Sequence, residues 1–496
     1  MAYGSTADPG PWYKVARIVA VLLILGVAGG VYAWWKFFRE VPQQVCEDVE
    51  PSRRGELCAS PEEERFKYGS LGAEWELGIP YPIFHVLPRV FGDLLPRPGG
   101  YRAFGIPWEE GRELPVGFSK KTVGFPRVTQ TCAICHAASY RTSPDATPVI
   151  VPSGPSHTTN AMAFLDFLEA AANDPRWSGD GMLPEMERYF DLGIDDKLLY
   201  RYLIIPLAKQ RVLEQARDFA WMHAHGRPAW GPGRDGPFNL TKFNLLRLPD
   251  DGTVDNADFP SIWNAGIREN TSLNWAGETQ DPLAVYIDAA LGLGAPPATV
   301  AGDMEKHREY LRAKQPPPWP FPVDAALAGE GGLVWQRECA TCHAPGGAYF
   351  GRVTPIEEIG TDRERFDTWT QADADKTNAK ALELGVVRKA MVKDVGYANQ
   401  PLDGIWLRAP YLHNGSVPSL TALLDPPAER PRTFWRGCDI YDPAAVGFRS
   451  TPADDDCPGL FLLDTTLRGE GNGGHLYGTD LPAAEKAALI EYLKTL

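Results

Sequence analysis

The sequence predicts a mainly α-helical protein with extensive irregular loops, built from one N-terminal membrane helix and two larger units. Three observations predict it. An apolar run occupies residues 15–38, amphipathic helical segments recur from residue 161 onward, and Gly- and Pro-rich stretches separate them. The chain has 496 residues, which suffices for two or three domains of roughly 100–200 residues each.

The apolar run is long enough to cross a membrane. Only Arg17 and Lys36, at its two ends, are charged, and Trp34, Trp35 and Phe38 lie at its C-terminal end, where an interfacial aromatic belt would lie. As a helix it would measure about 36 Å, against a hydrocarbon core of about 30 Å. We therefore expect residues 1–40 to form a cytoplasmic tail and an uncleaved anchor. A cleaved signal peptide, with residues 31–33 as the cleavage site, is the alternative.

The charge balance limits the partners of the protein. With 64 acidic and 49 basic residues the formal net charge is −15. A nucleic-acid-binding protein needs a basic face, so this class is excluded. The acidity would suit a cationic protein partner through electrostatic steering, although an acidic surface that serves only solubility is an equal alternative.

Eight cysteines fall into two groups. Cys46 with Cys58, and Cys438 with Cys457, form local pairs that each enclose a polar loop. Such pairs are typical of disulfides in an oxidising compartment. The alternative is four free thiols in a cytosolic protein.

The other four cysteines lie in two Cys-x-x-Cys-His segments, about two hundred residues apart. Covalent attachment of haem c accounts for every position: the two thiols add to the porphyrin vinyl groups, and the adjacent histidine becomes the proximal iron ligand. The sequence therefore predicts two haem c groups. Their attachment residues are Cys132, Cys135 and His136 for the first, and Cys339, Cys342 and His343 for the second.

Two other chemistries use paired thiols. A structural zinc site needs a second thiol pair 15–20 residues away, and these pairs lie much farther apart. A thioredoxin-like pair needs a strand before the motif and a helix that opens at it, whereas the first motif follows a lead-in with two Gly and two Pro. Haem c is attached outside the cytoplasmic membrane. We therefore expect a single-pass protein of the inner membrane, with residues 40–496 in the periplasm.

The first larger unit is predicted to span residues 41–315. Residues 46–130 are rich in Gly and Pro without a helical period, which predicts loops around the first haem. A short amphipathic helix is expected at 161–173, and a longer one at 196–225 with a kink at Pro206.

The second unit is predicted at residues 323–496, after a Pro-rich linker at 316–322. Its haem motif follows a helical lead-in, which is the usual opening of a cytochrome c domain. The chain ends in a helix after Pro482, with an apolar stripe at helical spacing.

These features resemble the di-haem cytochrome c peroxidase and MauG superfamily, and most closely its rubber-oxygenase-like (RoxA-like) branch. The resemblance covers residues 60–496. It depends on the two haem motifs, on APYLHNGSVPSL at 409–420 and on the closing segment GGHLYGTDLPAAEKAALIEYLKTL. It implies that one haem faces peroxide or dioxygen and that the other transfers or stores electrons. Calcium stays open as a further cofactor, although nothing in the sequence supports it.

The resemblance also suggests further site residues. Peroxidases of this superfamily carry a methionine ligand where this chain has Leu412, which cannot bind iron. His475, in a Gly-rich turn before the last helix, is therefore expected to be the distal ligand of the second haem. His413 is expected to be structural or to contact a propionate. His157 matches a displaceable distal histidine near the first haem, with a capped loop histidine as the alternative.

Three aromatic residues between the haem motifs are candidates for the catalytic pocket. The oxygenase branch lines its dioxygen pocket with Trp and Phe, and peroxidases place a Trp between their haems. Most aromatic residues of this region are expected in the core. The candidates for the pocket are Trp230, Phe243 and Trp275.

Two functions remain open from the sequence. The first is a redox enzyme in which peroxide or dioxygen reacts at one haem while electrons pass through the other. The second is a membrane-tethered cytochrome that carries electrons between a membrane complex and a soluble partner. The anchor and the acidity suit the carrier, whereas the superfamily pattern and the missing methionine favour the enzyme.

Overall fold

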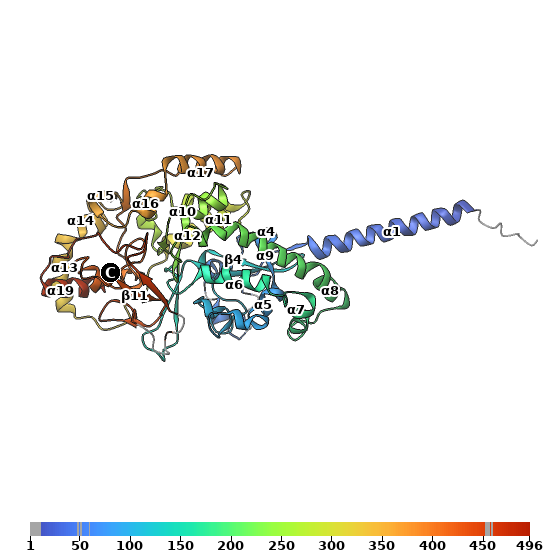
Figure 1. Cartoon of the computed structure of the whole chain (residues 1–496), viewed down its shortest axis with the longest axis horizontal. Coiled ribbons are helices and arrows are strands. Elements are labelled where there is room, and N and C mark those ends of the chain that lie inside the picture. Colours follow the sequence, from blue (N-terminus) through green and yellow to red (C-terminus); the bar gives the residue numbers. More distant parts are fainter. Residues whose placement is uncertain (1–10, 47–48, 50–51, 59, 452–456, 458–459) are drawn as a thin grey trace, which may run out of the picture.

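The computed structural model describes residues 11–46, 49, 52–58, 60–451, 457 and 460–496. Helices are its main regular structure, and the strands pair in small antiparallel sheets. Figure 1 shows an elongated body from which helix α1 (Pro11–Phe37) projects. The prediction of a mainly helical protein with an N-terminal apolar helix is confirmed.

Helix α1 is long and apolar enough over Trp12–Phe37 to cross a membrane, and none of its most apolar window is buried against the body. Its end is fixed to the body by strand β1 (Glu40–Val41), which pairs with β3 (Phe118–Val123). The backbone N–H of Gly124 also donates to the carbonyl oxygen of Arg39.

The prediction of loops between Cys46 and residue 130 is wrong, because this region contains helices α3 (Pro61–Tyr68) and α5 (Tyr81–Val90) and a four-stranded sheet. Proline misled the prediction in α5. Pro88 cannot donate to the carbonyl of Phe84, and the hydroxyl of Tyr101 donates to that oxygen instead, at 2.6 Å. The helix thus tolerates a proline in its last turns.

The four-stranded sheet leads into the first haem motif. Its strand order is β1-β3-β4-β2, with β4 at Phe125–Gln130 and β2 at Ile79–Pro80. Thr131 follows β4, and its side chain accepts a hydrogen bond from the N–H of Ala133. A 3-10 turn (Cys132–Ile134) then carries the thiols, and strand β5 (Ala137–Tyr140) follows and pairs with β6 (Val149–Pro152).

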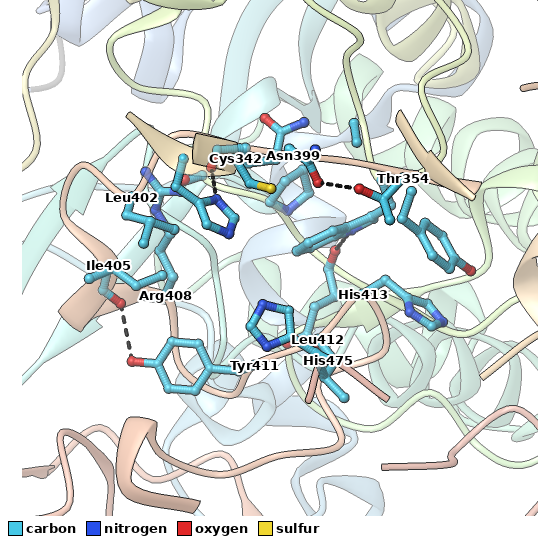
Figure 2. A pocket seen from close by; sticks show the side chains of 18 of the residues that line it. Cys342, Thr354, Asn399, Leu402, Ile405, Arg408, Tyr411, Leu412, His413 and His475 are labelled. Atoms are coloured by element: carbon cyan, nitrogen blue, oxygen red, sulfur yellow. Dashed lines mark hydrogen bonds between the residues drawn. The ribbon is translucent and has the colours of Figure 1, made fainter. Parts of the chain in front are cut away.

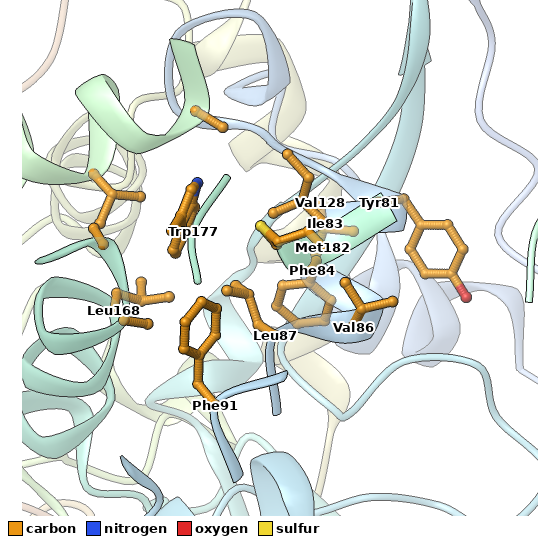
Figure 3. Packing of buried hydrophobic residues seen from close by; sticks show 14 of the residues in the cluster. Tyr81, Ile83, Phe84, Val86, Leu87, Phe91, Val128, Leu168, Trp177 and Met182 are labelled. Carbon is orange, nitrogen blue, oxygen red and sulfur yellow. The ribbon is translucent and has the colours of Figure 1, made fainter. Parts of the chain in front are cut away.

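Beside this sheet lies the first hydrophobic core, in which Phe84, Phe91 and Trp177 pack with residues of α6 (Ala161–Asn173), α7 (Gly179–Met186) and α9 (Figure 3). Helix α6 has the bounds that the sequence predicts. The helix expected at 196–225 is divided directly before Pro206, and its last α-helical residue is Phe219. Helix α8 (Ile194–Leu199) passes through a π turn (Tyr200–Ile204) into α9 (Ile205–Phe219).

The Pro-rich segment 316–322 follows α12 (Val300–Ala313) and packs on the second hydrophobic core. Trp319 contacts Trp406 and Tyr441, with ring centroids 5.7 and 5.5 Å apart. The same core includes Trp263, which belongs to the first predicted unit. The two halves therefore share packing, and the domain boundaries stay a prediction.

The second haem motif follows a helical lead-in, as expected. Helix α13 (Ala325–Glu338) leads into the short α14 (Ala340–His343), and α13 packs against the last helix, α19 (Ala483–Leu493). A Cβ atom at Gly331 would lie 1.8 Å from the carbonyl oxygen of Ala488, so glycine permits the close crossing of α13 and α19.

The remaining elements are short helices and strands around these two cores. They are α2 (Arg54–Leu57), α4 (Glu74–Leu77), α10 (Pro237–Asn239), α11 (Pro282–Gly292), α15 (Ile356–Ile359), α16 (Glu364–Thr368), α17 (Gln371–Glu383), α18 (Leu420–Leu423), β7 (Arg234–Asp235), β8 (Ala257–Asp258), β9 (Val353–Pro355), β10 (Gly396–Ala398), β11 (Thr433–Arg436), β12 (Tyr441–Asp442), β13 (Gly447–Phe448) and β14 (Phe461–Asp464).

Candidate haem-binding site

The cysteines divide in the structure as the sequence predicts. Cys46 is bonded to Cys58, and Cys438 to Cys457. The two disulfides are therefore confirmed. The four thiols of the Cys-x-x-Cys-His segments are free. Burial raises the pKa of Cys132 and of Cys339 to about 12, so these thiols are not the low-pKa thiolates of a redox dithiol.

His136 follows the first thiol pair with its ring in a fixed orientation. Its Nδ1 lies 2.9 Å from the carbonyl oxygen of Pro260. Because a carbonyl can only accept, Nδ1 carries the proton and Nε2 presents a lone pair. Burial lowers the pKa of His136 to about 4, which keeps the ring neutral and able to bind a metal.

His343 repeats this arrangement after the second thiol pair. Its Nδ1 lies 2.6 Å from the carbonyl oxygen of Gln400. The side-chain amide of Gln400 in turn donates to the carbonyl oxygens of Ser272 (3.3 Å) and Asn274 (3.1 Å). The acceptor is therefore held in place by the other half of the chain. Burial lowers the pKa of His343.

His475 faces His343, with ring centroids 6.4 Å apart and planes inclined by 40°. Two imidazoles on one metal, with each metal–nitrogen bond at roughly 2.0 Å, place their centroids about 6 Å apart. The observed separation fits one iron held between the two rings. Nδ1 of His475 is buried without a hydrogen-bond partner among the described residues, and burial lowers the pKa of this ring to about 4.

The Gly-rich turn before His475 fixes the position of this histidine opposite His343. His475 has a left-handed backbone (φ +48°), and its N–H donates to the carbonyl oxygen of Ile359 at 2.8 Å. Arg430 donates to the carbonyl oxygens of Asn472 (2.6 Å) and Gly474 (2.9 Å), which fixes the turn. A Cβ at Gly474 would lie 2.3 Å from the carbonyl carbon of Gly360, so only glycine fits.

The two histidines lie on the wall of a cavity of about 480 Å³. Figure 2 shows Cys342, Asn399 and Thr354 on one side of this cavity, and Tyr411, Leu412 and His475 on the other. Much of the wall is aliphatic, and segments of both halves of the chain contribute to it. The larger aliphatic residues are Ile262, Leu273, Val285, Ile359, Leu402, Ile405, Leu412, Leu420, Leu423, Leu424, Leu489 and Leu493.

Two arginines add positive charge to this wall. Arg268 and Arg408 have buried N–H groups without a hydrogen-bond acceptor in the described part of the chain, at Nε and Nη2 of Arg268 and at Nε of Arg408. Both lie near the carboxylate of Asp403, which is 3.7 Å from Arg268 and 2.8 Å from Arg408. Buried guanidinium groups without acceptors fit the propionates of a haem. The residues present thus match an apolar, dianionic porphyrin.

Leu412 and His413 differ in what they contribute. Leu412 lines the cavity with a left-handed backbone (φ +68°) and offers no ligand atom. The ring of His413 stacks on Tyr397, with centroids 4.3 Å apart, and burial lowers its pKa to about 3. The carbonyl of His413 accepts from the N–H of Asp258. These contacts agree with the structural role expected of His413.

The four residues predicted for catalysis lie in different places. Trp275 lines the cavity, and its Nε1 donates to the carbonyl oxygen of Asp258 at 2.9 Å. Trp230 and Phe243 instead pack around Trp221 in a separate aromatic cluster. His157 is buried and stacks on Phe448, with centroids 3.7 Å apart. The catalytic roles of these four residues stay predictions.

A buried ionic cluster beside the cavity was not expected from the sequence. Arg365 lies 3.7 Å from Asp255 and 3.5 Å from Glu278, and covers the ring of Phe238 at 4.1 Å. Burial raises the pKa of Asp255, and of the neighbouring Asp235, to about 7. These carboxyl groups can therefore hold a proton near neutral pH. No sequence signal indicates the cluster, because its members are scattered over more than a hundred residues.

Comparison with known proteins agrees with this site. The RoxA-like, cytochrome c-like family matches residues 396–436, which contain the acceptor Gln400, the cavity residue Leu412 and His413. A cytochrome c-like domain implies haem c as the cofactor.

Two proteins of Sinorhizobium fredii (strain NBRC 101917 / NGR234) are similar to the chain. Uncharacterized protein y4iJ is 32% identical, over 86% of this chain and 89% of its own length. Uncharacterized protein y4iM is 31% identical, over 54% of this chain and 71% of its own length. The chain therefore belongs to the same family as y4iJ, and its segment 396–436 is RoxA-like and cytochrome c-like.

Proposed function

We propose that this protein is a membrane-anchored periplasmic cytochrome with two covalent haem c groups that acts as a redox enzyme. Peroxide or dioxygen reacts at the haem held by His136, and electrons pass through the haem held by His343 and His475. The observation that carries the proposal is the pair His343 and His475, whose rings face each other at 6.4 Å across a cavity lined by Cys339 and Cys342.

Haem c supplies an iron that exchanges electrons and, where a coordination position is open, binds a small oxidant. The chain sets what each iron can do. The carbonyls of Pro260 and Gln400 hold the Nδ1 proton of His136 and His343, which directs Nε2 toward the metal and makes it more basic. The low pKa values of these rings keep the proton from competing for Nε2.

The two sites differ in the proposed role. His343 and His475 would together hold the second iron, and a haem with both histidines bound would transfer electrons rather than bind an oxidant. The oxidant site is therefore assigned to the first haem, with His157 as a displaceable group nearby. Trp275 lies on the cavity wall between the two halves, where it suits electron transfer or the lining of a pocket. Trp230 and Phe243 remain candidates for that pocket.

The location follows from three features taken together. Helix α1 can cross a membrane, the disulfides need an oxidising compartment, and haem c is attached outside the cytoplasm. We propose the inner membrane, with residues 40–496 on the periplasmic side. The net charge of −15 favours a cationic redox partner. Membership of the wider peroxidase and MauG superfamily belongs to the same proposal.

Spectroscopy of the purified protein tests the function. We expect pigment that stays with the chain in acidified organic solvent, one low-spin haem with two histidine ligands, and one high-spin haem that binds cyanide. Two low-spin haems that bind neither cyanide nor imidazole would contradict the enzyme and support the electron carrier instead. Turnover with hydrogen peroxide, compared with dioxygen plus an isoprenoid polymer, then separates a peroxidase from an oxygenase.

A further inference from the structure

An exposed apolar stripe runs along α8, the π turn and α9. The inner face of these helices is buried in the first core through Tyr200, Ile204, Ile205, Ala208 and Val212. The outer face exposes large apolar side chains to solvent. They are Ile194 (80% exposed), Leu198 (53%), Tyr202 (72%) and Leu207 (50%).

The spacing keeps these side chains on one face. Ile194, Leu198 and Tyr202 follow one another at intervals of four residues, as neighbours on an α-helix do. Leu207 comes five residues after Tyr202, and the π turn at Tyr200–Ile204 accommodates the extra residue. The stripe therefore runs from α8 through the π turn and ends at Leu207, in the first turn of α9.

The stripe begins where α1 meets the body. The hydroxyl of Tyr32 donates to a carboxylate oxygen of Asp195 at 2.7 Å, and Lys36 pairs with both Asp195 and Asp196. Next to this contact, Phe38 packs on the exposed Trp75, with ring centroids 5.4 Å apart. Figure 1 shows α8 and α9 beside the base of α1.

These contacts place α8 at the level of a membrane surface. A hydrocarbon core of about 30 Å takes up about 20 helical residues, so a span that begins at Val15 ends near Trp34. Tyr32 and Lys36, which hold α8, lie at this boundary, and the Trp and Tyr residues around them are typical of the interface. The stripe adjoins the segment at which the chain leaves the bilayer.

We propose that the outer face of α8 and α9, together with Trp75, lies in the interface of the same bilayer that α1 crosses. The occupant of the stripe is lipid. An amphipathic face of this kind inserts roughly 5–10 Å into the boundary between headgroups and acyl chains. Its attraction is apolar rather than electrostatic, because the protein is acidic overall. The inference depends on the proposed anchoring by α1 but not on the haem chemistry.

Site-directed spin labels on the full-length holoprotein in phosphatidylcholine and phosphatidylglycerol vesicles test the proposal. Labels are placed by Leu198→Cys and Tyr202→Cys on the stripe. Leu382→Cys is the matched control, because Leu382 is apolar, 74% exposed and lies on α17, away from α1 (Figure 1). Leu23→Cys, within α1, reports on the anchor itself. An unchanged Soret band shows that each variant keeps its fold.

We expect the labels at 198 and 202 to gain collisions with oxygen and to lose collisions with a water-soluble nickel chelate, relative to the label at 382. A label at 23 in lipid with water-exposed labels at 198 and 202 would overturn this inference and leave the anchor standing. A water-exposed label at 23 would overturn both. Labels at 198 and 202 that are shielded from both reagents would indicate a second copy of the chain on the stripe, and would also overturn it.

Discussion

The two Cys-x-x-Cys-His segments have the same chemistry on different local scaffolds. The first lies in a 3-10 turn between strands β4 and β5, whereas the second lies at the end of two consecutive helices, α13 and α14. Yet His136 and His343 both donate from Nδ1 to a backbone carbonyl far away in the chain. The motif therefore needs its own residues and one external acceptor, but no particular secondary structure.

The surroundings of the two segments differ in a second way. His343 faces another imidazole across a large cavity, with two buried arginines on the wall. His157, the candidate near the first segment, is engaged in stacking on Phe448. The two segments therefore differ in what surrounds the proximal histidine, and the following experiments test that difference.

Removing one thiol pair at a time should have the largest effect. We expect Cys132→Ala with Cys135→Ala, and separately Cys339→Ala with Cys342→Ala, each to abolish one of two attachment sites. The covalent pyridine haemochrome absorbance per chain should fall to about half in both. Full absorbance in either double variant would show that its segment holds no haem.

Replacing His475 by alanine should change the spin state of one haem without loss of pigment. The imidazole opposite His343 is removed, so one low-spin signal should become high-spin in electron paramagnetic resonance. His413→Ala is the control for a second histidine of the same cavity, because its ring stacks on Tyr397 and does not face His343. An unchanged spectrum for His475→Ala would contradict its role as a ligand.

The contact between the halves includes a buried ion pair between Arg234 (0% exposed) and Glu470 (2% exposed). Arg234→Met leaves the carboxylate of Glu470 without its partner. We expect the free energy of unfolding in urea to fall by about 3–5 kcal/mol. Lys306→Gln, which removes an exposed pair with Asp303, should leave it unchanged. Equal stability of the two variants would show that the halves are held together elsewhere.

Helix caps should give the smallest differences. Asn160 caps α6 in the first half by accepting from the N–H of Ala163, at 3.0 Å. Thr370 caps α17 in the second half, where Asp373 completes a capping box. We expect Asn160→Ala to lower the free energy of unfolding by about 1 kcal/mol, and Thr370→Ala to lower it by less and so to give a smaller midpoint shift, because α17 lies at the surface. A larger shift for Thr370→Ala would contradict this order.

Much of the site is visible in the sequence because its chemistry needs neighbouring residues. Thiols and proximal histidine must be adjacent to bind one porphyrin, so Cys339, Cys342 and His343 form a recognisable string. Local disulfides and the apolar α1 are visible for the same reason. The glycines before His475 also indicated this residue, because a left-handed turn that approaches Gly360 closely requires glycine at Gly474. The helix α5 was missed because proline usually interrupts a helix. Only the structure shows that the hydroxyl of Tyr101 donates to the carbonyl oxygen of Phe84, which Pro88 leaves without a backbone donor.

The sequence alone thus predicted where the chain would attach haem, and it determined which cysteines form disulfides and which segment can cross a membrane, because each depends on residues close together in the chain. Only the tertiary structure decided which carbonyls orient the two histidines, that His475 faces His343, and that Arg268 and Arg408 reach one cavity. Those contacts join segments that are far apart in the chain. They form only when the chain packs, so no local pattern of residues predicts them.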